Sequence, residues 1–158
     1  MSGVVVLGIG NILMQDEGVG VHAVRALSDG GLPEGVAAVD GGTLGLELLP
    51  IVEEAGALVL VDAARMGRAP GSFGVFRGGD LFHGYGGHVS PHQAGAADLI
   101  AAARLTGGLP ERCTLFGVEP GAIDFGLELS AEVAAALPEV VLAVMAEAEA
   151  LREVARDA

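Results

Sequence analysis

Three carboxylates and one imidazole are the side chains in this sequence that could hold a divalent metal together. Glu17 follows a glycine turn near the start of the chain, and Asp40 and Asp62 each end a short apolar run. His92 stands where a helix is expected to begin. Carboxylate oxygens and a neutral imidazole form a ligand set that suits a divalent metal. The sequence therefore predicts a metal site, provided that the fold brings these residues together.

Each of these residues also has an ordinary structural explanation. An Asp at a strand end often caps the next helix or turns the loop, and a lone histidine at a helix start is more often on the surface than a ligand. Asp40 is the best candidate for a purely structural role, because two glycines follow it. His83 and His88, on the glycine-rich segment 78–89, are rival ligands. Only the candidates taken together favour a site.

The elements that must position these residues begin with a strand, a glycine turn and a helix in residues 4–27. Residues 4–7 are all apolar, as in a strand that is buried on both faces. Gly8 and Gly10 then allow a tight turn. Small and apolar residues recur at helical spacing after it, at Gly20, Ala23, Val24 and Leu27. This order opens a βαβ unit.

The same stretch argues against a dinucleotide-binding fingerprint. Leu13 stands where the fingerprint requires its third glycine. Asp16 and Glu17 occupy the expected first turn of the helix, where a phosphate would otherwise bind. Asp16 could cap the helix and Glu17 could complement its dipole. This structural explanation accounts well for one acid at this position but less well for two. Glu17 also falls on the Val24 side of the helix, so it could face the crevice above the sheet.

Further apolar segments predict four more strands and the helices between them. The strands are expected at 36–39, 57–61, 72–77 and 113–118. The helices are expected at 44–55, from 90, and in a turn at 130–137 followed by a last helix that Pro138 either starts or kinks. Pro50 is expected to kink or break the second helix. About nine residues join the third strand to the fourth, whereas a parallel crossover needs roughly a dozen or more. The fourth strand should therefore run antiparallel to its neighbours.

The helix that carries His92 is predicted to begin at Ser90. Ser90 suits the N-cap, Pro91 suits the first helical position, and Gln93 closes a capping box. Near a helix N-terminus a proton on imidazole is disfavoured, so His92 should stay neutral and able to ligate a metal. Apolar residues within 96–103 continue its stripe toward the core.

Parallel strands place their carboxyl ends at one edge of an open α/β sheet, which is where ligands bind. Glu17 lies just past the first strand, Asp40 ends the second and Asp62 ends the third. We therefore expect these side chains to meet at one edge, together with His92 if its helix opens there.

Length and composition limit the class of protein. The chain has 158 residues, so we expect one domain over residues 1–158. The five apolar segments separated by helical patterns, and the short connection after the third strand, predict an α/β fold of three layers with a mixed, mostly parallel, twisted five-stranded sheet between helices. The net charge of −13 argues against nucleic acid as a partner. No apolar run reaches the ~18 residues that a membrane span needs, and no secretory leader is visible.

The cysteine content adds a prediction about location. Cys113 is the single cysteine, which excludes an internal disulfide and fits a reducing cytoplasm. Its place inside an apolar strand indicates a core residue rather than a nucleophile. We expect a cytoplasmic monomer that does not bind a membrane.

Five motifs, in order along the chain, resemble the hydrogenase maturation proteases, the endopeptidases that process nickel–iron hydrogenase large subunits. They are GIGNILMQDEGVG at 8–20, DGGT at 40–43, the VLVD that ends at Asp62, SPHQAG at 90–95 and LFGVEP at 115–120. The resemblance runs from Val4 to about Leu142. Any one motif would be weak evidence, but the combination is specific.

The resemblance implies a substrate and a set of metal-contacting residues. Members of that family trim a short C-terminal extension from the large-subunit precursor after nickel has been inserted. The family's metal-contacting residues match Glu17, Asp62 and His92, and the nickel is expected to arrive with the precursor as its recognition signal. Asp40 matches the family's Asp in DGGT, whose role is less settled. No serine or cysteine triad is needed if metal and carboxylates polarise the scissile carbonyl or activate water.

Two other functions stay open on the residues alone. One is an autonomous metallopeptidase or amidase that holds its own zinc. The other is a non-catalytic module that binds a nucleotide or another ligand, which Asp16 and Glu17 disfavour for nucleotides.

Overall fold

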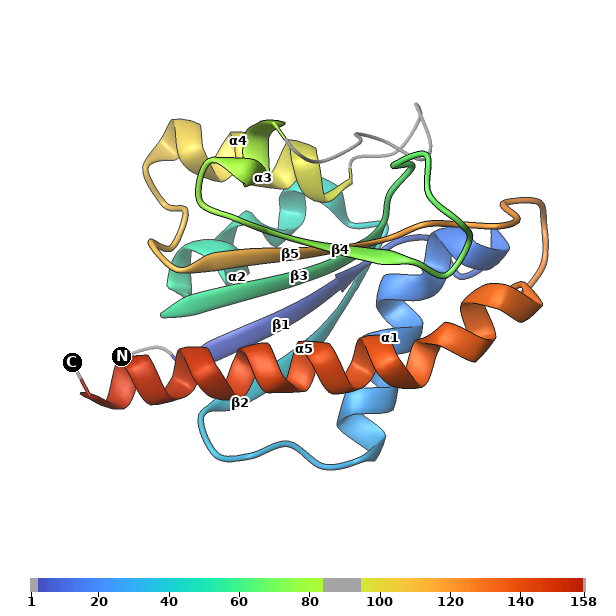
Figure 1. Cartoon of the computed structure of the whole chain (residues 1–158). Helices are drawn as coiled ribbons and strands as arrows, with labels where there is room; N and C mark the ends of the chain where they lie inside the picture. Colours follow the sequence, from blue (N-terminus) through green and yellow to red (C-terminus); the bar gives the residue numbers. More distant parts are fainter. Residues whose placement is uncertain (1–2, 84–94, 158) are drawn as a thin grey trace.

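Five strands form one twisted sheet in the order β2-β1-β3-β5-β4 (Figure 1). The structure is a computed structural model that describes residues 3–83 and 95–157. The strands are β1 (Val4–Ile9), β2 (Val36–Gly42), β3 (Ala57–Ala63), β4 (Phe73–Arg77) and β5 (Cys113–Val118). Four of them run parallel, and β4 runs antiparallel to β5, with Phe73 opposite Val118. Both the mixed five-stranded sheet and the reversed fourth strand are confirmed.

Helices cover both faces of the sheet and complete the three layers (Figure 1). One face packs against α1 (Val19–Asp29) and the long α5 (Ala131–Asp157). The other face packs against η2 (Gly45–Leu48), α2 (Leu49–Glu54), α3 (Asp80–His83) and α4 (Ala96–Thr106). Within the described residues, no helix is both long and apolar enough to cross a bilayer.

The central strand β3 shows why an uninterrupted apolar run is needed here. All seven of its residues are buried. Val59 and Val61 pack on the α1 and α5 side, whereas Leu58 and Leu60 pack on the α2 and α4 side. A strand covered by helices on both faces must be apolar at odd and even positions alike.

Glycines let α1 lie directly on the carboxyl end of the sheet. A Cβ added at Gly8 would collide with the carbonyl oxygen of Gly20, and one added at Gly20 would collide with that of Val61. Gly10 has φ +140 and lies against the carbonyl of Glu17. These close approaches bring the short 3-10 helix η1 (Gln15–Gly18) against the end of β3.

Three predicted helix boundaries are corrected. The segment expected as one helix with a kink at Pro50 is a 3-10 turn, η2, followed by α2, in whose first turn Pro50 lies. The helix expected from Ser90 begins instead at Ala96, because Gly95 has an extended backbone and serves as its N-cap. Residues 90–93 themselves lie outside the described part of the chain. The two segments expected around Pro138 form one helix, α5, so Pro138 lies inside the helix and does not start it.

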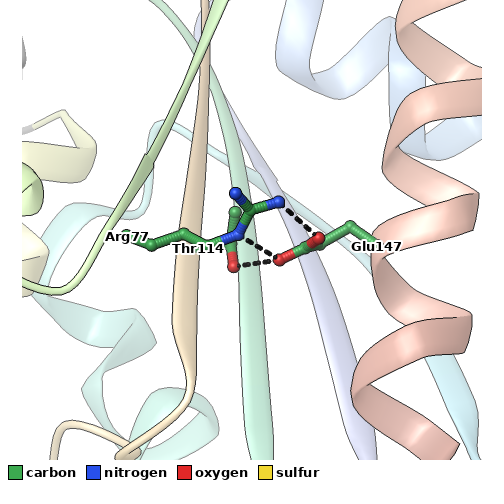
Figure 2. A network of polar contacts seen from close by, with 3 residues as sticks. All are labelled: Arg77, Thr114 and Glu147. Atoms are coloured by element: carbon green, nitrogen blue, oxygen red, sulfur yellow. Dashed lines mark hydrogen bonds and ion pairs between the residues drawn. The ribbon is translucent and has the colours of Figure 1, made fainter.

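A polar contact ties the edge strand to α5 (Figure 2). Arg77 on β4 donates to both carboxylate oxygens of Glu147 on α5, at 2.9 and 2.7 Å. The Thr114 hydroxyl on β5 donates to the same carboxylate at 2.5 Å. The contact therefore joins two strands to the helix that crosses them.

Candidate functional site

The carboxyl ends of the four parallel strands lie together at one edge of the sheet, which we call the carboxyl edge. Register places Val39 beside Leu7, Leu7 beside Leu60, and Leu60 beside Leu115. The segments that follow these strands, 10–18, 43–48, 64–72 and 119–130, therefore emerge at this edge. In open α/β sheets this is where ligands bind.

Glu17 is a buried carboxylate that has no hydrogen-bond partner among the described residues. It lies in η1 and is 6% exposed. None of the described residues donates a hydrogen bond to its side chain, and burial raises the pKa of Glu17 above its usual value. An unpartnered buried acid is costly in a fold. Such a group at a ligand-binding edge is a candidate functional residue.

Asp62 is also a buried acid at the carboxyl edge. It is the sixth residue of β3, is 6% exposed, and faces the α4 side of the sheet, as Leu58 and Leu60 do. Its carboxylate accepts a hydrogen bond of 2.9 Å from the backbone N–H of Ala96, the first residue of α4. The positive end of this helix favours the charged carboxylate. Because η1 packs against β3, Glu17 and Asp62 share one end of this strand.

The side chains of the histidine candidates lie outside the part of the chain that the structure describes. His92 and His88 lie outside the described residues, and so does the side chain of His83, which ends α3. His92 stands four positions before Ala96 in the sequence, and Ala96 is the residue whose N–H binds Asp62. Among the described residues, no three Asp, Glu, His or Cys side chains cluster as metal ligands would. The set of Glu17, Asp62 and His92 therefore stays a prediction.

Asp40 reaches the same edge but faces the other side of the sheet. Both Asp40 and Val61 lie beside Gly8, so Asp40 is in phase with Val61 and out of phase with Asp62. Its carboxylate forms an ion pair of 3.1 Å with Arg25 of α1, and both side chains are substantially exposed. An exposed pair of this kind contributes about 0–1 kcal/mol. All three acids lie at the carboxyl edge, but the expectation that their side chains meet is wrong for Asp40, which faces the opposite side of the sheet from Asp62.

A pocket of about 320 Å³ lies between Asp40 and the loop that precedes Glu17. Asn11, Leu13, Arg25 and Thr43 contribute to its walls. It offers amide, hydroxyl and charged groups beside an apolar side chain, a combination that can accept part of a peptide.

Asp16 has a role that the sequence did not disclose. The prediction that it caps α1 is wrong, because no side-chain hydrogen bond caps that helix. Its carboxylate instead accepts hydrogen bonds from the N–H groups of Gly121, Ala122 and Ser130 and from the Ser130 hydroxyl, at 2.7–2.8 Å. Burial would raise the pKa of Asp16, but these hydrogen bonds outweigh it and lower the pKa. Asp16 therefore fixes the loop that follows β5.

Glu119 was also missed as a structural residue. It directly follows β5 and is 6% exposed. Its Oε1 accepts hydrogen bonds from the N–H groups of Met66 and Arg68, at 2.7 and 3.1 Å. It thus holds the loop that leaves Asp62. The sequence signal that could have identified Glu119 is that it stands at the carboxyl end of a predicted parallel strand, as Asp62 does.

Cys113 is a core residue, as predicted. It is the first residue of β5 and is buried. It therefore lies at the amino end of the strand, away from the carboxyl edge where Asp62 lies. Burial raises the pKa of this thiol to about 12. A thiol that stays protonated cannot serve as the nucleophile.

Comparison with known proteins identifies the family. The family model "Hydrogenase maturation protease" matches residues 21–147. Hydrogenase 2 maturation protease of Escherichia coli (strain K12) is 38% identical over 152 residues, which cover 95% of this chain and 91% of that protein. The hydrogenase expression/formation protein HupD of Rhodobacter capsulatus is 43% identical over 95% of this chain and 70% of its own.

Solved structures agree with the sequence match. The hydrogenase maturating endopeptidase HybD from E. coli has a TM-score of 0.81 at 37% identity, with 96% of this chain and 93% of that chain covered. The [NiFe] hydrogenase maturation protease HybD from Thermococcus kodakarensis has a TM-score of 0.72 at 27% identity, with 92% and 99% covered. The chain therefore belongs to the hydrogenase maturation protease family, and it is a peptidase.

Proposed function

We propose that this peptidase removes the C-terminal extension of a nickel–iron hydrogenase large-subunit precursor after nickel insertion. In this proposal Glu17, Asp62 and His92 recognise the nickel, which is part of the substrate rather than a resident cofactor. The observation that carries the proposal is the buried carboxylate of Glu17 at the carboxyl edge, to which no residue in the described part of the chain donates a hydrogen bond. The names of the relatives, maturation proteases of hydrogenases, supply the class of substrate.

The chemistry of the two described acids fits a metal-bearing substrate. A cation that arrives with the precursor would neutralise Glu17 and supply a partner that none of the described residues provides. Asp62 keeps its orientation through the Ala96 N–H, as ligating carboxylates are usually held by hydrogen bonds. His92 stands just upstream of that N–H in the sequence and would supply the nitrogen ligand.

Cleavage would then depend on carboxylates rather than on a thiol. Cys113 is buried and protonated at the opposite edge of the sheet. Nickel bound between substrate and protease would act as a Lewis acid toward a carbonyl or a water. Glu17 and Asp62 would position that centre, and the pocket beside Asp40 is within the same edge and would receive part of the chain near the cleavage point.

The decisive experiment is incubation with candidate large-subunit precursors, with and without nickel, followed by intact mass. We expect a nickel-loaded precursor to lose a defined C-terminal fragment, while the nickel-free precursor stays whole. Equal cleavage of both forms would overturn the recognition of nickel but leave the peptidase assignment in place. Failure to cleave any loaded precursor would overturn the proposed function.

A metal analysis of the purified protein separates the proposal from an enzyme with its own zinc. Protein prepared without added metal should carry neither zinc nor nickel in stoichiometric amounts. One zinc per chain, lost together with activity in the Glu17→Gln variant, would favour an autonomous metallopeptidase.

A further inference from the structure

Two loops at the carboxyl edge are paired through their backbones. The Gly126 N–H donates to the carbonyl of Leu13 at 2.9 Å, and the Gln15 N–H donates to the carbonyl of Gly126 at 3.0 Å. These bonds form a short parallel bridge between Met14 and Gly126. The segment before Glu17 and the segment after β5 thus form one continuous surface.

The buried carboxylate of Asp16 holds the second of these loops in place. Asp16 is fully buried, and its carboxylate accepts four hydrogen bonds from Gly121, Ala122 and Ser130. Its own N–H donates to the carbonyl of Ala122 at 3.0 Å. The backbone of residues 121–130 is therefore anchored at both ends by one buried carboxylate.

Large apolar side chains project from this anchored surface into solvent. Phe125 is 88% exposed, Leu127 65% and Leu13 56%. Two more exposed leucines, Leu44 and Leu46, follow β2 at the same edge. Contiguous exposed apolar side chains on an ordered surface usually mark a site for another molecule. We call Leu13, Phe125 and Leu127 the apolar ledge.

The charges around the apolar ledge define what it can bind. Asp124 and Glu128 are exposed beside Phe125 and Leu127, and residues 10–24 and 119–131 contain no Lys or Arg. Arg25, which lines a pocket together with Leu13, forms an ion pair with Asp40. An occupant with apolar side chains flanked by basic ones would match both features. Acidic surroundings would repel an acidic partner and steer a basic one toward the edge.

We propose that the apolar ledge docks the large-subunit precursor, through a segment in which apolar residues are flanked by basic ones. This inference rests on the proposed function and names a contact that lies outside the metal-contacting residues. The ledge is continuous with the proposed site, because Leu13 precedes Glu17 by four residues on the same segment. Docking here would hold the precursor while its C-terminal extension reaches the acids.

The test compares two pairs of exposed apolar residues. The ledge variant is Phe125→Ser with Leu127→Ser. The control is Leu105→Ser with Leu142→Ser, which changes equally exposed side chains on the outer surfaces of α4 and α5. Each protein is assayed with nickel-loaded precursor for the dissociation constant, KM and kcat, and its own mass in solution is measured.

The ledge variant should raise the dissociation constant and KM by about tenfold or more, as expected for loss of one or two buried apolar contacts, with kcat unchanged. The control should match the parent. Binding by the parent should also weaken as the salt concentration rises, because salt screens the attraction between the acidic residues around the ledge and the basic residues of the precursor.

Other outcomes separate this inference from the proposed function. If the parent cleaves the precursor and the ledge variant binds and cleaves equally well, docking at the ledge is wrong and the function stands. If the parent binds but does not cleave, and the ledge variant loses binding, docking stands and the function falls. If the parent does not bind the precursor, both fall. A parent dimer that the ledge variant dissolves would make the ledge an interface between two copies and overturn the proposal.

Discussion

Asp16 and Ser130 are joined by two hydrogen bonds although 114 residues separate them. The N–H and the hydroxyl of Ser130 donate to the two carboxylate oxygens of Asp16, at 2.8 and 2.7 Å. The next residue, Glu17, is equally deep but has no such partner among the described residues. Two adjacent acids therefore have opposite roles: one satisfies the backbone of a loop, and the other remains available to a ligand.

Asp16→Ala should destabilise the fold by about 2–4 kcal/mol. It removes the acceptor of four hydrogen bonds and leaves buried donors in the 121–130 loop without a partner, which costs about 1–3 kcal/mol for each group that water cannot reach. Equilibrium urea denaturation measures the change. Asp124→Ala, at an exposed position of the same loop, should stay within about 0.5 kcal/mol of the parent. Equal stability of parent and Asp16→Ala would mean that the loop is not held by this carboxylate.

The role of Asp16 illustrates which part of the site could not be predicted from sequence. Apolar periodicity located all five strands, and the short connection after β3 predicted the antiparallel β4. The partners of Asp16 lie more than a hundred residues away, and only the packed sheet brings them together. Sequence-local capping rules assigned Asp16 to the nearest helix, for which it provides no cap.

Two other corrections have a similar physical origin. Ser90, Pro91 and Gln93 are good capping residues, but the extended backbone of Gly95 and the bond from its N–H to Asp98 set the start of α4. For Asp40 the missing information was register. The pairing of Gly8 with both Asp40 and Val61 shows which way Asp40 faces, and no single strand contains that information.

Glu147→Gln should lower stability near neutral pH but have less effect in acid. The hydrogen bond from Arg77 lowers the pKa of Glu147, burial opposes this, and the bond from Thr114 lowers it further. An acid with a lowered folded pKa contributes stability above its unfolded pKa, near 4.5, and this contribution is lost as the pH falls through the folded pKa. The parent should therefore exceed the variant by about 1–2 kcal/mol at pH 7.

Urea denaturation of both proteins from pH 7 to pH 3 checks this dependence. The difference between them should shrink below about pH 4.5. Glu139→Gln, which removes an exposed acid from the same helix, serves as the control and should show a small difference throughout. A difference that stays constant with pH would exclude the ion pair in Figure 2 as its source.

Cys113 should resist thiol reagents in the folded protein. Burial raises the pKa of its thiol to about 12, so the reactive thiolate is scarce at pH 8. The residue is also buried, which limits access by a reagent. Iodoacetamide labelling followed by intact mass should show no adduct without denaturant and one adduct in urea. Cys113→Ala should retain processing of the precursor if it remains folded, and its complete inactivity would contradict a core role.

Glu17→Gln and His92→Ala should abolish processing without unfolding the protein. Glu17 is buried and has no partner within residues 3–83 and 95–157, so replacing its charge with an amide of similar shape should leave stability unchanged or raise it slightly. His92 precedes the N-cap of α4, so its loss leaves the Gly95 and Asp98 contact intact. Thermal unfolding should therefore show near-parental melting temperatures, while intact mass shows an uncleaved nickel-loaded precursor. Glu47→Gln, at an exposed acid of the same edge, should process normally. If both ligand variants stay folded and cleave at the parent's rate, Glu17 and His92 are not metal-contacting residues, and the recognition of nickel must be assigned elsewhere on the chain.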